Sequence, residues 1–125
     1  MAVKVVDASV VVALVFGEPE AGEAAALLGD SELVAPMLLR YELANAAWKK
    51  AKRRPSKGPV VAEGVKLAGE LDIHHVDVDH AGVLDLALEL DVTTYDASYL
   101  WLARNLKAPL ATFDARLKRA MSCSR

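Results

Sequence analysis

The sequence predicts an α/β fold in which a short parallel sheet of about four to five strands is covered by helices on both faces, as a three-layer sandwich. Short runs rich in β-branched residues alternate with helical segments along the chain, which is typical of parallel strands joined by helices. The 125 residues match the usual length of one domain, and no linker or internal repeat divides them. We therefore expect a single domain over residues 1–125.

The first half of the chain predicts two strands and three helices. Residues 3–7 form a β-rich run that ends in an acid, so we expect a buried strand, followed by a helix over residues 8–16. Pro19 lies between two glutamates, as in the first turn of a second helix that reaches about residue 28. Residues 33–35 predict the second strand, and Pro36 begins the longest helix, which runs to about residue 54.

The second half predicts two more strands and four helices. A polar turn over residues 53–59 precedes a helix over residues 60–71 and a strand over residues 73–78. Asp79 is placed to cap a helix over residues 80–90, and Thr94 or Asp96 begins another that ends near residue 107. A strand over residues 110–113 and a helix over residues 114–121 complete the pattern.

Composition excludes several classes of protein. With 54% hydrophobic residues and a net charge of −2, the chain is too apolar to be disordered and lacks the overall charge of a nucleic-acid binder. The longest apolar run, residues 10–16, is too short to cross a bilayer, and the start of the chain lacks the pattern of a signal peptide. The single cysteine, Cys123, excludes a disulfide framework and a Cys-rich zinc site. We expect a cytoplasmic protein in which Cys123 is an exposed tail thiol.

A dense basic run follows the middle of the longest predicted helix. Six basic residues lie within nine positions: Lys49, Lys50, Lys52, Arg53, Arg54 and Lys57. The run has two interpretations, which the sequence leaves open. It is either the solvated carboxyl end of a helix, where basic residues are favoured, or a track that binds RNA phosphates without reading the base sequence.

Three aspartates are candidates for one site at the carboxyl edge of the sheet. Asp7 follows the first strand, Asp114 follows the last strand, and Asp96 lies at the start of a helix. Each has an alternative interpretation as a helix N-cap, because aspartate is a preferred capping residue. Ser9 and Thr94 could instead cap the helices after Asp7 and around Asp96, which would leave those two carboxylates free.

A fourth acid, Glu42, lies beside the apolar stripe that we expect on the longest helix, with leucines at the neighbouring helical positions. That stripe comprises Met37, Tyr41, Ala44, Trp48 and Ala51. A carboxylate flanked by leucines is partly desolvated, so it needs a cation or a raised pKa. The alternative is a glutamate at the solvent edge of the stripe.

Four acids that meet at one edge need a counter-charge, because like charges at close range disfavour ionisation. No Lys or Arg lies within five residues of Asp96, and Asp7 has only Lys4 nearby. Oxygen ligands without His or Cys favour Mg²⁺ or Mn²⁺ over zinc. A site of this kind suits the hydrolysis of a phosphate ester.

The segments around the four acids resemble the PIN-domain ribonucleases, and in particular the VapC toxins of bacterial and archaeal toxin–antitoxin pairs. Four motifs carry the resemblance in chain order: Val-Val-Asp7-Ala-Ser9, Pro36-x4-Tyr-Glu42-Leu-Ala-Asn45, Tyr95-Asp96-Ala-Ser-Tyr99 and Thr112-x-Asp114-x-x-Leu117. The resemblance implies the PIN-domain fold and a Mg²⁺- or Mn²⁺-dependent endoribonuclease whose catalytic and metal-binding acids are Asp7, Glu42, Asp96 and Asp114. Within that set, we expect Asp7 and Asp96 to be the principal metal ligands.

The resemblance also implies supporting groups and partners. Ser9 and Thr112 match positions where the family often has a hydroxyl near the metal. A homodimer and a small cognate antitoxin are implied, and we expect the antitoxin to place a basic side chain among the acids. An apolar groove around Leu14, Leu27, Leu38 and Trp48 would hold its helix. The alternative function is a non-catalytic PIN-like module that binds protein or RNA.

Overall fold

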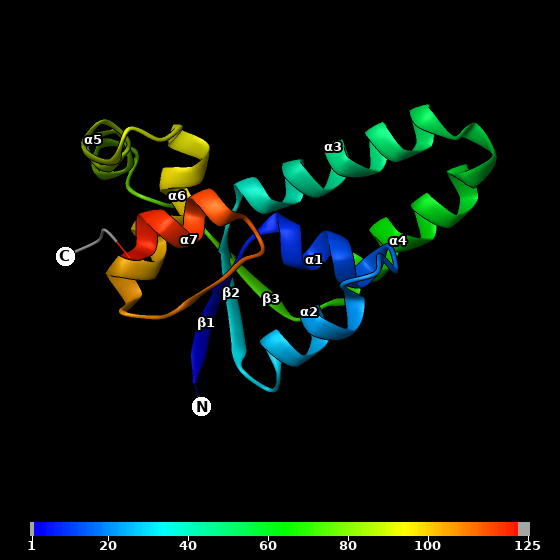
Figure 1. Cartoon of the computed structure of the whole chain (residues 1–125), viewed down its shortest axis with the longest axis horizontal. Helices are drawn as coiled ribbons and strands as arrows, with labels where there is room; N and C mark the ends of the chain where they lie inside the picture. The colour runs from blue at the N-terminus through cyan, green and yellow to red at the C-terminus, as the bar shows by residue number, and fades with distance from the viewer. Residues whose placement is uncertain (1, 123–125) are drawn as a thin grey trace.

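The computed structural model of the protein describes residues 2–122, so Cys123 and Arg125 lie outside the described part. A parallel sheet of four strands runs through its centre in the order β3-β2-β1-β4 (Figure 1). The strands are β1 (Val3–Val6), β2 (Glu32–Pro36), β3 (Ile73–Val76) and β4 (Leu110–Ala111). The predicted α/β fold is confirmed.

Seven α-helices and one 3₁₀ helix surround the sheet within residues 2–122. They are α1 (Ala8–Val15), α2 (Ala21–Leu28), α3 (Leu38–Arg53), η1 (Pro55–Lys57), α4 (Gly58–Glu70), α5 (His80–Leu90), α6 (Thr94–Leu106) and α7 (Ala115–Ser122). The turn predicted over residues 53–59 is wrong, because η1 and the first turn of α4 occupy it. Pro55 is the first residue of η1 and Pro59 is the second residue of α4. At these positions the missing N–H of proline costs no helical hydrogen bond. Among the described residues, none of the helices is both long and apolar enough to span a membrane.

The sheet is buried on both faces because neighbouring residues of its central strand point in opposite directions. Val6 packs into the core that α1 and α2 cover, whereas Val5 packs against α6 on the other face. Both side chains are fully buried. This arrangement fixes the end of β1, and with it the residue that follows, between two helical layers.

The last strand is shorter than the predicted residues 110–113. It ends at Ala111, because the next two residues bond to polar groups beyond β1. The Thr112 hydroxyl donates to Asp7, and the Phe113 N–H donates to the Ser9 hydroxyl. Polar contacts therefore replace strand pairing where β4 leaves the sheet.

The buried face of α3 differs from the predicted stripe. Leu39, Leu43 and Ala47 are buried, whereas Tyr41 and Trp48 are 73% and 57% exposed. The leucines meet the core beside β2, while the far half of α3 projects past the sheet with α4 as a hairpin (Figure 1). The expected apolar stripe is wrong, because it follows the aromatic residues rather than the leucines.

A close contact at Gly64 holds the hairpin against the body of the protein. A Cβ atom at Gly64 would lie 2.4 Å from two carbons of the Phe16 ring and 3.1 Å from the Val15 carbonyl oxygen. We expect Gly64→Ala to lower the free energy of unfolding by about 1–3 kcal/mol, because the ring must shift. Gly69→Ala is the matched control, since nothing lies within 4 Å of its Cβ position. The free energy of unfolding of that control, measured in urea, should rise by about 0.5–1 kcal/mol. Equal changes in the free energy of unfolding at the two sites would contradict the close contact at Gly64.

Candidate active site

The carboxyl ends of β1 and β4 form the crevice where a doubly wound sheet binds its ligands. The chain passes from β1 to β2 and β3 on one side, then returns to β4 on the other side of β1. Ligands of such sheets bind outside the carboxyl ends of the strands at this reversal of order. Asp7 follows β1 directly, and Thr112 follows β4 directly.

Asp7 is the most enclosed of the four acids, with 4% of its surface exposed. Its Oδ1 accepts a hydrogen bond from the Ser9 hydroxyl at 2.6 Å, and its Oδ2 accepts one from the Thr112 hydroxyl at 2.6 Å. Burial raises the pKa of the Asp7 carboxyl, these hydrogen bonds oppose the rise, and the charge of Asp114 adds to it. Asp7 also caps α1 through a 3.4 Å contact from the Val10 N–H, so Ser9 does not replace it as the cap.

The two hydroxyls beside Asp7 also position the loop that follows β4. Ser9 Oγ accepts from the Phe113 N–H at 2.9 Å, and Thr112 Oγ1 accepts from the Asp114 N–H at 2.9 Å. Each hydroxyl therefore donates to Asp7 and accepts from this loop. The arrangement fixes both the direction of the Asp7 carboxylate and the start of α7.

Asp114 is a helix cap as well as a member of the acidic group. Its Oδ1 accepts from the Arg116 N–H at 2.8 Å and from the Leu117 N–H at 3.3 Å. The alternative interpretation of this residue as an N-cap is therefore confirmed. Its second carboxylate oxygen, Oδ2, takes no part in the cap and lies 3.7 Å from Arg116 Nη2.

Glu42 is half-buried and hydrogen-bonded, so it is not a free glutamate at a solvent edge. Its Oε1 accepts from the Tyr99 hydroxyl at 2.5 Å. Burial raises the pKa of the Glu42 carboxyl, and the negative charges of Asp7 and Asp96 raise it further, against the hydrogen bond. Tyr99 is 2% exposed, and burial together with Glu42 raises the pKa of its hydroxyl. Tyr99 was missed as a contributor to the site, although its place one helical turn after Asp96 was a signal.

Asp96 has a carboxylate that caps no helix. Its own N–H donates to Thr93 Oγ1 at 3.1 Å, so Thr93 caps α6 rather than Thr94 or Asp96. Burial raises the pKa of the Asp96 carboxyl, the Arg116 guanidinium lowers it, and Asp114 raises it. Among the three aspartates, Asp96 is the one without a side-chain hydrogen bond from the described residues.

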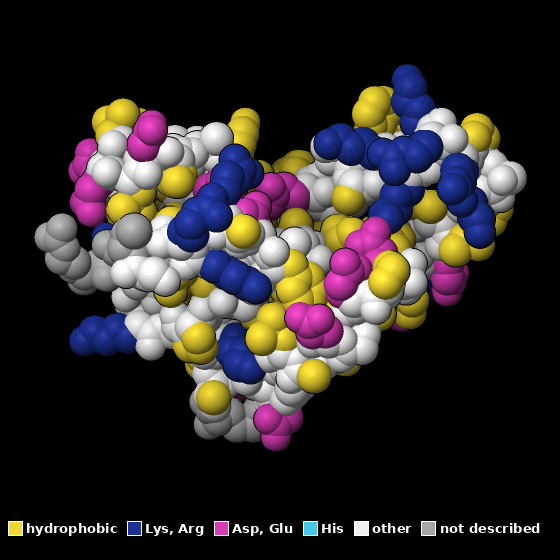
Figure 2. Space-filling model, in the orientation of Figure 1, with side chains coloured by type: hydrophobic (Ala, Val, Ile, Leu, Met, Phe, Trp, Pro, Cys, Tyr) yellow, Lys and Arg dark blue, Asp and Glu magenta, His cyan; other side chains and the backbone are white. Residues whose placement is uncertain are grey.

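Contacts through Arg116 and Thr112 place three of the four acids near one another, and the electrostatic influence of each acid on the others is consistent with Glu42 beside them. The charge of Asp114 raises the pKa of both Asp7 and Asp96. The charges of Asp7 and Asp96 in turn raise the pKa of Glu42. These four interactions form a closed ring among side chains from four separate segments of the chain. Figure 2 shows acidic side chains gathered in the hollow between α3 and α7.

One basic side chain shares the hollow, contrary to the expectation drawn from the sequence. Arg116 Nη2 lies 3.8 Å from Asp96 Oδ2, although the two residues are far apart in the chain. The Arg116 side chain is 67% exposed, so this pair is a weak, solvent-screened interaction. Lys4, the base nearest to Asp7 in sequence, donates to the Leu27 carbonyl instead. Arg116 is thus a partial counter-charge for the acids.

Comparison with known proteins identifies the family of the chain. The family described as PIN domain matches residues 4–121. The chain belongs to the PIN-domain family. It is 32% identical over 118 residues to Ribonuclease VapC3 of Pyrobaculum aerophilum, with 90% of each chain covered, so the resemblance to VapC-like proteins is confirmed. A crystal structure of PAE2754 from Pyrobaculum aerophilum has a TM-score of 0.78 and 28% identity, and the match covers 95% of this chain and 79% of that one.

The donor set of this PIN domain fits a hard divalent cation. It consists of carboxylate oxygens, which Mg²⁺ and Mn²⁺ prefer, and three of the carboxyls have pKa values raised by burial. Within residues 2–122, no group of three or more acidic, histidine or cysteine side chains is arranged so that it could hold a metal ion by itself. Mg²⁺ needs no such cage, because it binds one or two carboxylates and keeps several waters.

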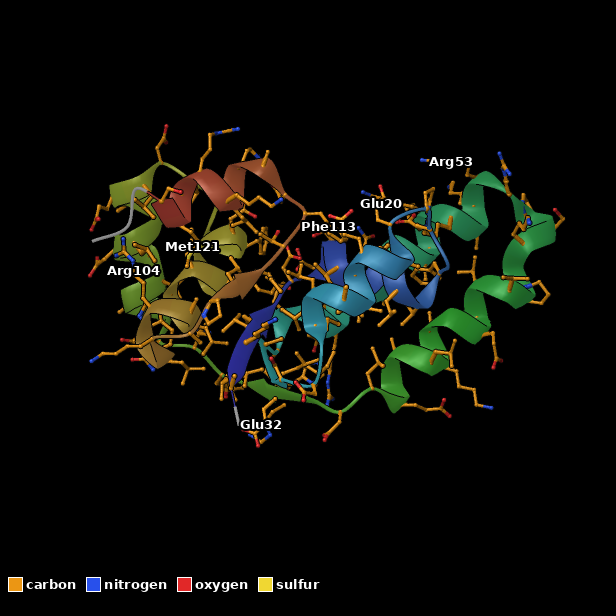
Figure 3. All side chains as sticks on the ribbon, turned by 60° about the horizontal axis from the view of Figure 1, so that its bottom comes forward. Glu20, Glu32, Arg53, Arg104, Phe113 and Met121 are labelled. Carbon is orange, nitrogen blue, oxygen red and sulfur yellow. The ribbon has the colours of Figure 1, made fainter. Side chains whose placement is uncertain are left out.

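The six basic residues of α3, η1 and the residue between them lie apart from the acidic hollow. Lys50 Nζ pairs with Glu18 Oε2 at 2.5 Å and stands 5.4 Å from the centre of the Phe16 ring. Lys52 Nζ stands 5.1 Å from the centre of the Trp48 ring. Figure 2 shows Lys and Arg side chains over the far half of α3, and Figure 3 shows Arg53 extending outward from that helix.

Arg116 competes with any cation that binds the acids, which gives a test of its position. We expect Arg116→Gln to strengthen Mn²⁺ binding by about two- to fivefold, the range that corresponds to the loss of exposed ion pairs. The pKa of Asp96 should rise in the same variant, because the guanidinium lowers it. Isothermal titration calorimetry measures the affinity, with Arg119→Gln on the same helix as the control. Weaker Mn²⁺ binding by Arg116→Gln than by the control would contradict the competition.

Proposed function

We propose that residues 1–125 form one PIN domain that is a Mg²⁺- or Mn²⁺-dependent endoribonuclease and hydrolyses RNA phosphodiester bonds. The observation that carries the proposal is the convergence of four mutually repelling carboxylates at the carboxyl edge of the sheet. The name of the similar Ribonuclease VapC3 supports RNA as the substrate. The alternative of a non-catalytic module has no comparable observation in its favour.

Asp7, Glu42, Asp96 and Asp114 would hold the cation, with Asp7 and Asp96 as the principal ligands. The bound metal would supply Lewis acidity, which activates a water and neutralises charge on the phosphate. The Ser9 and Thr112 hydroxyls keep Asp7 in one orientation before substrate arrives. This preorganisation reduces the cost of assembling the site.

Glu42 has a carboxylate suited to handling a proton. Tyr99 holds Oε1, which leaves Oε2 available to orient a water for attack on the phosphorus. Burial raises the pKa of the carboxyl and so increases its basicity when it is ionised. Tyr99 is a positioning residue in this scheme, because it contacts Glu42 and not the substrate.

The substrate would follow the basic residues on α3 and η1. Lys49, Lys52, Arg53, Arg54 and Lys57 are exposed, and Lys50 is half-buried beside Glu18. Contacts with phosphates would bind RNA without reading the base sequence. The residues of this run would therefore contribute affinity rather than cleavage specificity.

We also assign this protein, as part of the same proposal, to the cytoplasm as the toxin of a toxin–antitoxin pair and as a homodimer. The position of Arg116 beside Asp96 and Asp114 supports inhibition by a basic side chain, because a guanidinium is already accommodated there. The small antitoxin would place its own basic side chain near Asp7, Glu42 and Asp96.

The groove expected for the antitoxin remains a prediction. Leu14, Leu27 and Leu38 are partly buried against the core, so of the four residues only Trp48 is exposed. The three leucines contribute to the core packing of helices α1, α2 and α3 and keep part of their surface accessible.

Purified protein incubated with single-stranded RNA tests the enzymatic function. We expect internal cleavage with Mg²⁺ or Mn²⁺ and none with a chelator. Because the nucleophile is water, a substrate with 2′-deoxyribose at the cut should still be cleaved, and no product should carry a cyclic phosphate. Binding of RNA without cleavage under every metal condition would favour the non-catalytic module.

A further inference from the structure

A second cavity, separate from the acidic hollow, lies where the α3–α4 hairpin meets α1. Its volume is about 330 Å³. Basic and apolar side chains line it together: Lys50, Arg53, Arg54, Lys57, Phe16, Val60 and Val61. A pocket that combines cations with an apolar surface suits a ligand that has both an anionic and an apolar part.

The positive charge of this cavity is largely uncompensated. Lys50 pairs with Glu18, but no carboxylate in the described part of the chain pairs with Arg53, Arg54 or Lys57. Helix α4 begins at the cavity, and no side chain caps its first turn. The helix dipole therefore adds to the field of the basic residues.

The cavity is linked to the acidic hollow along one face of α3. Lys49 comes seven residues after Glu42, and Arg53 comes four residues after Lys49. At these spacings the three residues lie on the same side of the helix. Eleven residues of helix span about 17 Å. At about 3.4 Å per stacked nucleotide, that distance corresponds to roughly five nucleotides of a single strand.

We propose that this cavity is a nucleotide subsite that holds one residue of the RNA substrate about five nucleotides from the cleaved bond. The guanidinium groups of Arg53 and Arg54 bind the phosphate, since their fork matches its oxygens. The base packs against Phe16 and Val60. The proposal rests on the proposed ribonuclease function for the identity of the strand. An acidic peptide is the competing class of ligand for these cations, and its binding is an outcome of the tests below.

Fluorescence anisotropy with a labelled 12-nucleotide RNA tests the charge of the subsite. Binding is measured in chelator, so that cleavage plays no part. Arg53→Gln combined with Arg54→Gln should reduce the slope of log affinity against log salt by about 0.7, because both guanidinium groups bind one phosphate and each phosphate contact on a single strand contributes about 0.7. Lys66→Gln combined with Lys107→Gln is the matched control, because both residues are exposed and away from the cavity. A slope equal to that of the wild type in the Arg53/Arg54 variant would overturn the proposal.

A set of RNAs with one abasic position each tests the subsite for a base. We expect one position, about five nucleotides from the mapped cut, at which loss of the base weakens binding several-fold. This difference in affinity between the abasic and the intact RNA should disappear in Val60→Glu, which places an acid at an exposed position of the cavity lining. Equal effects at every position, or binding of polyglutamate in place of RNA, would overturn the subsite. The expected change of salt slope in the Arg53/Arg54 variant, together with one abasic position that weakens binding but no cleavage of the RNA, would refute the proposed function and leave a nucleotide subsite in this cavity.

Discussion

Asp7→Asn and Asp96→Asn are each expected to lower RNA cleavage by more than about a hundredfold and to weaken Mn²⁺ binding. Replacing a residue that only supports a metal ligand typically costs about 10–100-fold, so loss of a principal ligand should cost more. Thr112→Val, which removes one hydrogen bond to Asp7, should fall within the smaller range. Calorimetry with Mn²⁺ and initial cleavage rates measure the two effects.

Stability distinguishes loss of function from loss of the fold in these variants. Without metal, Asp7→Asn should unfold at about the same urea concentration, because the absence of a buried charge offsets the loss of one of the two oxygens that accept hydroxyl hydrogen bonds. Asp85→Asn, on the exposed face of α5, is the control and should leave cleavage unchanged. Unchanged Mn²⁺ affinity in both Asp7→Asn and Asp96→Asn would exclude these residues as ligands.

The pH dependence of stability is expected to reverse when Mn²⁺ is added. Burial raises the pKa values of Asp7, Glu42 and Asp96 in the folded protein above their unfolded values. The folded state therefore binds more protons, and the contribution of these acids to stability is largest below the unfolded pKa values. That contribution is lost as the pH rises through the raised values. Mn²⁺ binds the ionised carboxylates, so saturating metal should make stability rise with pH instead.

Urea unfolding across a pH series, with and without Mn²⁺, measures this reversal. Glu42→Gln isolates one contribution, because glutamine can still accept the hydrogen bond from Tyr99. Relative to Glu42→Gln, the metal-free wild type should lose stability as the pH rises. When the pH is lowered far enough for the carboxyls to protonate, Mn²⁺ affinity should also fall. The fall should be about tenfold per pH unit for each proton that the metal displaces. A difference between wild type and Glu42→Gln that stays constant with pH would contradict the raised pKa of Glu42.

Local sequence signals were sufficient to predict the edge of the sheet and the candidate acids. A β-branched run marks β1, a short apolar run marks β2, and parallel strands place their carboxyl ends on one edge. Asp7 and Asp114 follow strands, so their approach could be anticipated before the structure was known. Glu42 could be placed there because leucines flank it on α3 and predict its partial burial.

Contacts between distant segments could not be predicted in this way. Arg116 reaches Asp96 only because α7 packs against α6, and Tyr99 reaches Glu42 across the interface of α6 and α3. The buried face of α3 was misassigned for a related reason. Aromatic and leucine stripes both have helical spacing, and the position of the sheet decides which of them is covered.

Anomalous scattering from crystals soaked in Mn²⁺ tests the central claim most directly, because it locates the cation without an assay of activity. We expect a manganese peak in the hollow between α3 and α7, beside Asp7 and Asp96, with Glu42 and Asp114 close enough to bind through water. The same soak of Asp96→Asn should give a weaker peak or none. Manganese bound elsewhere on the protein, with the four carboxylates free of metal, would contradict the account.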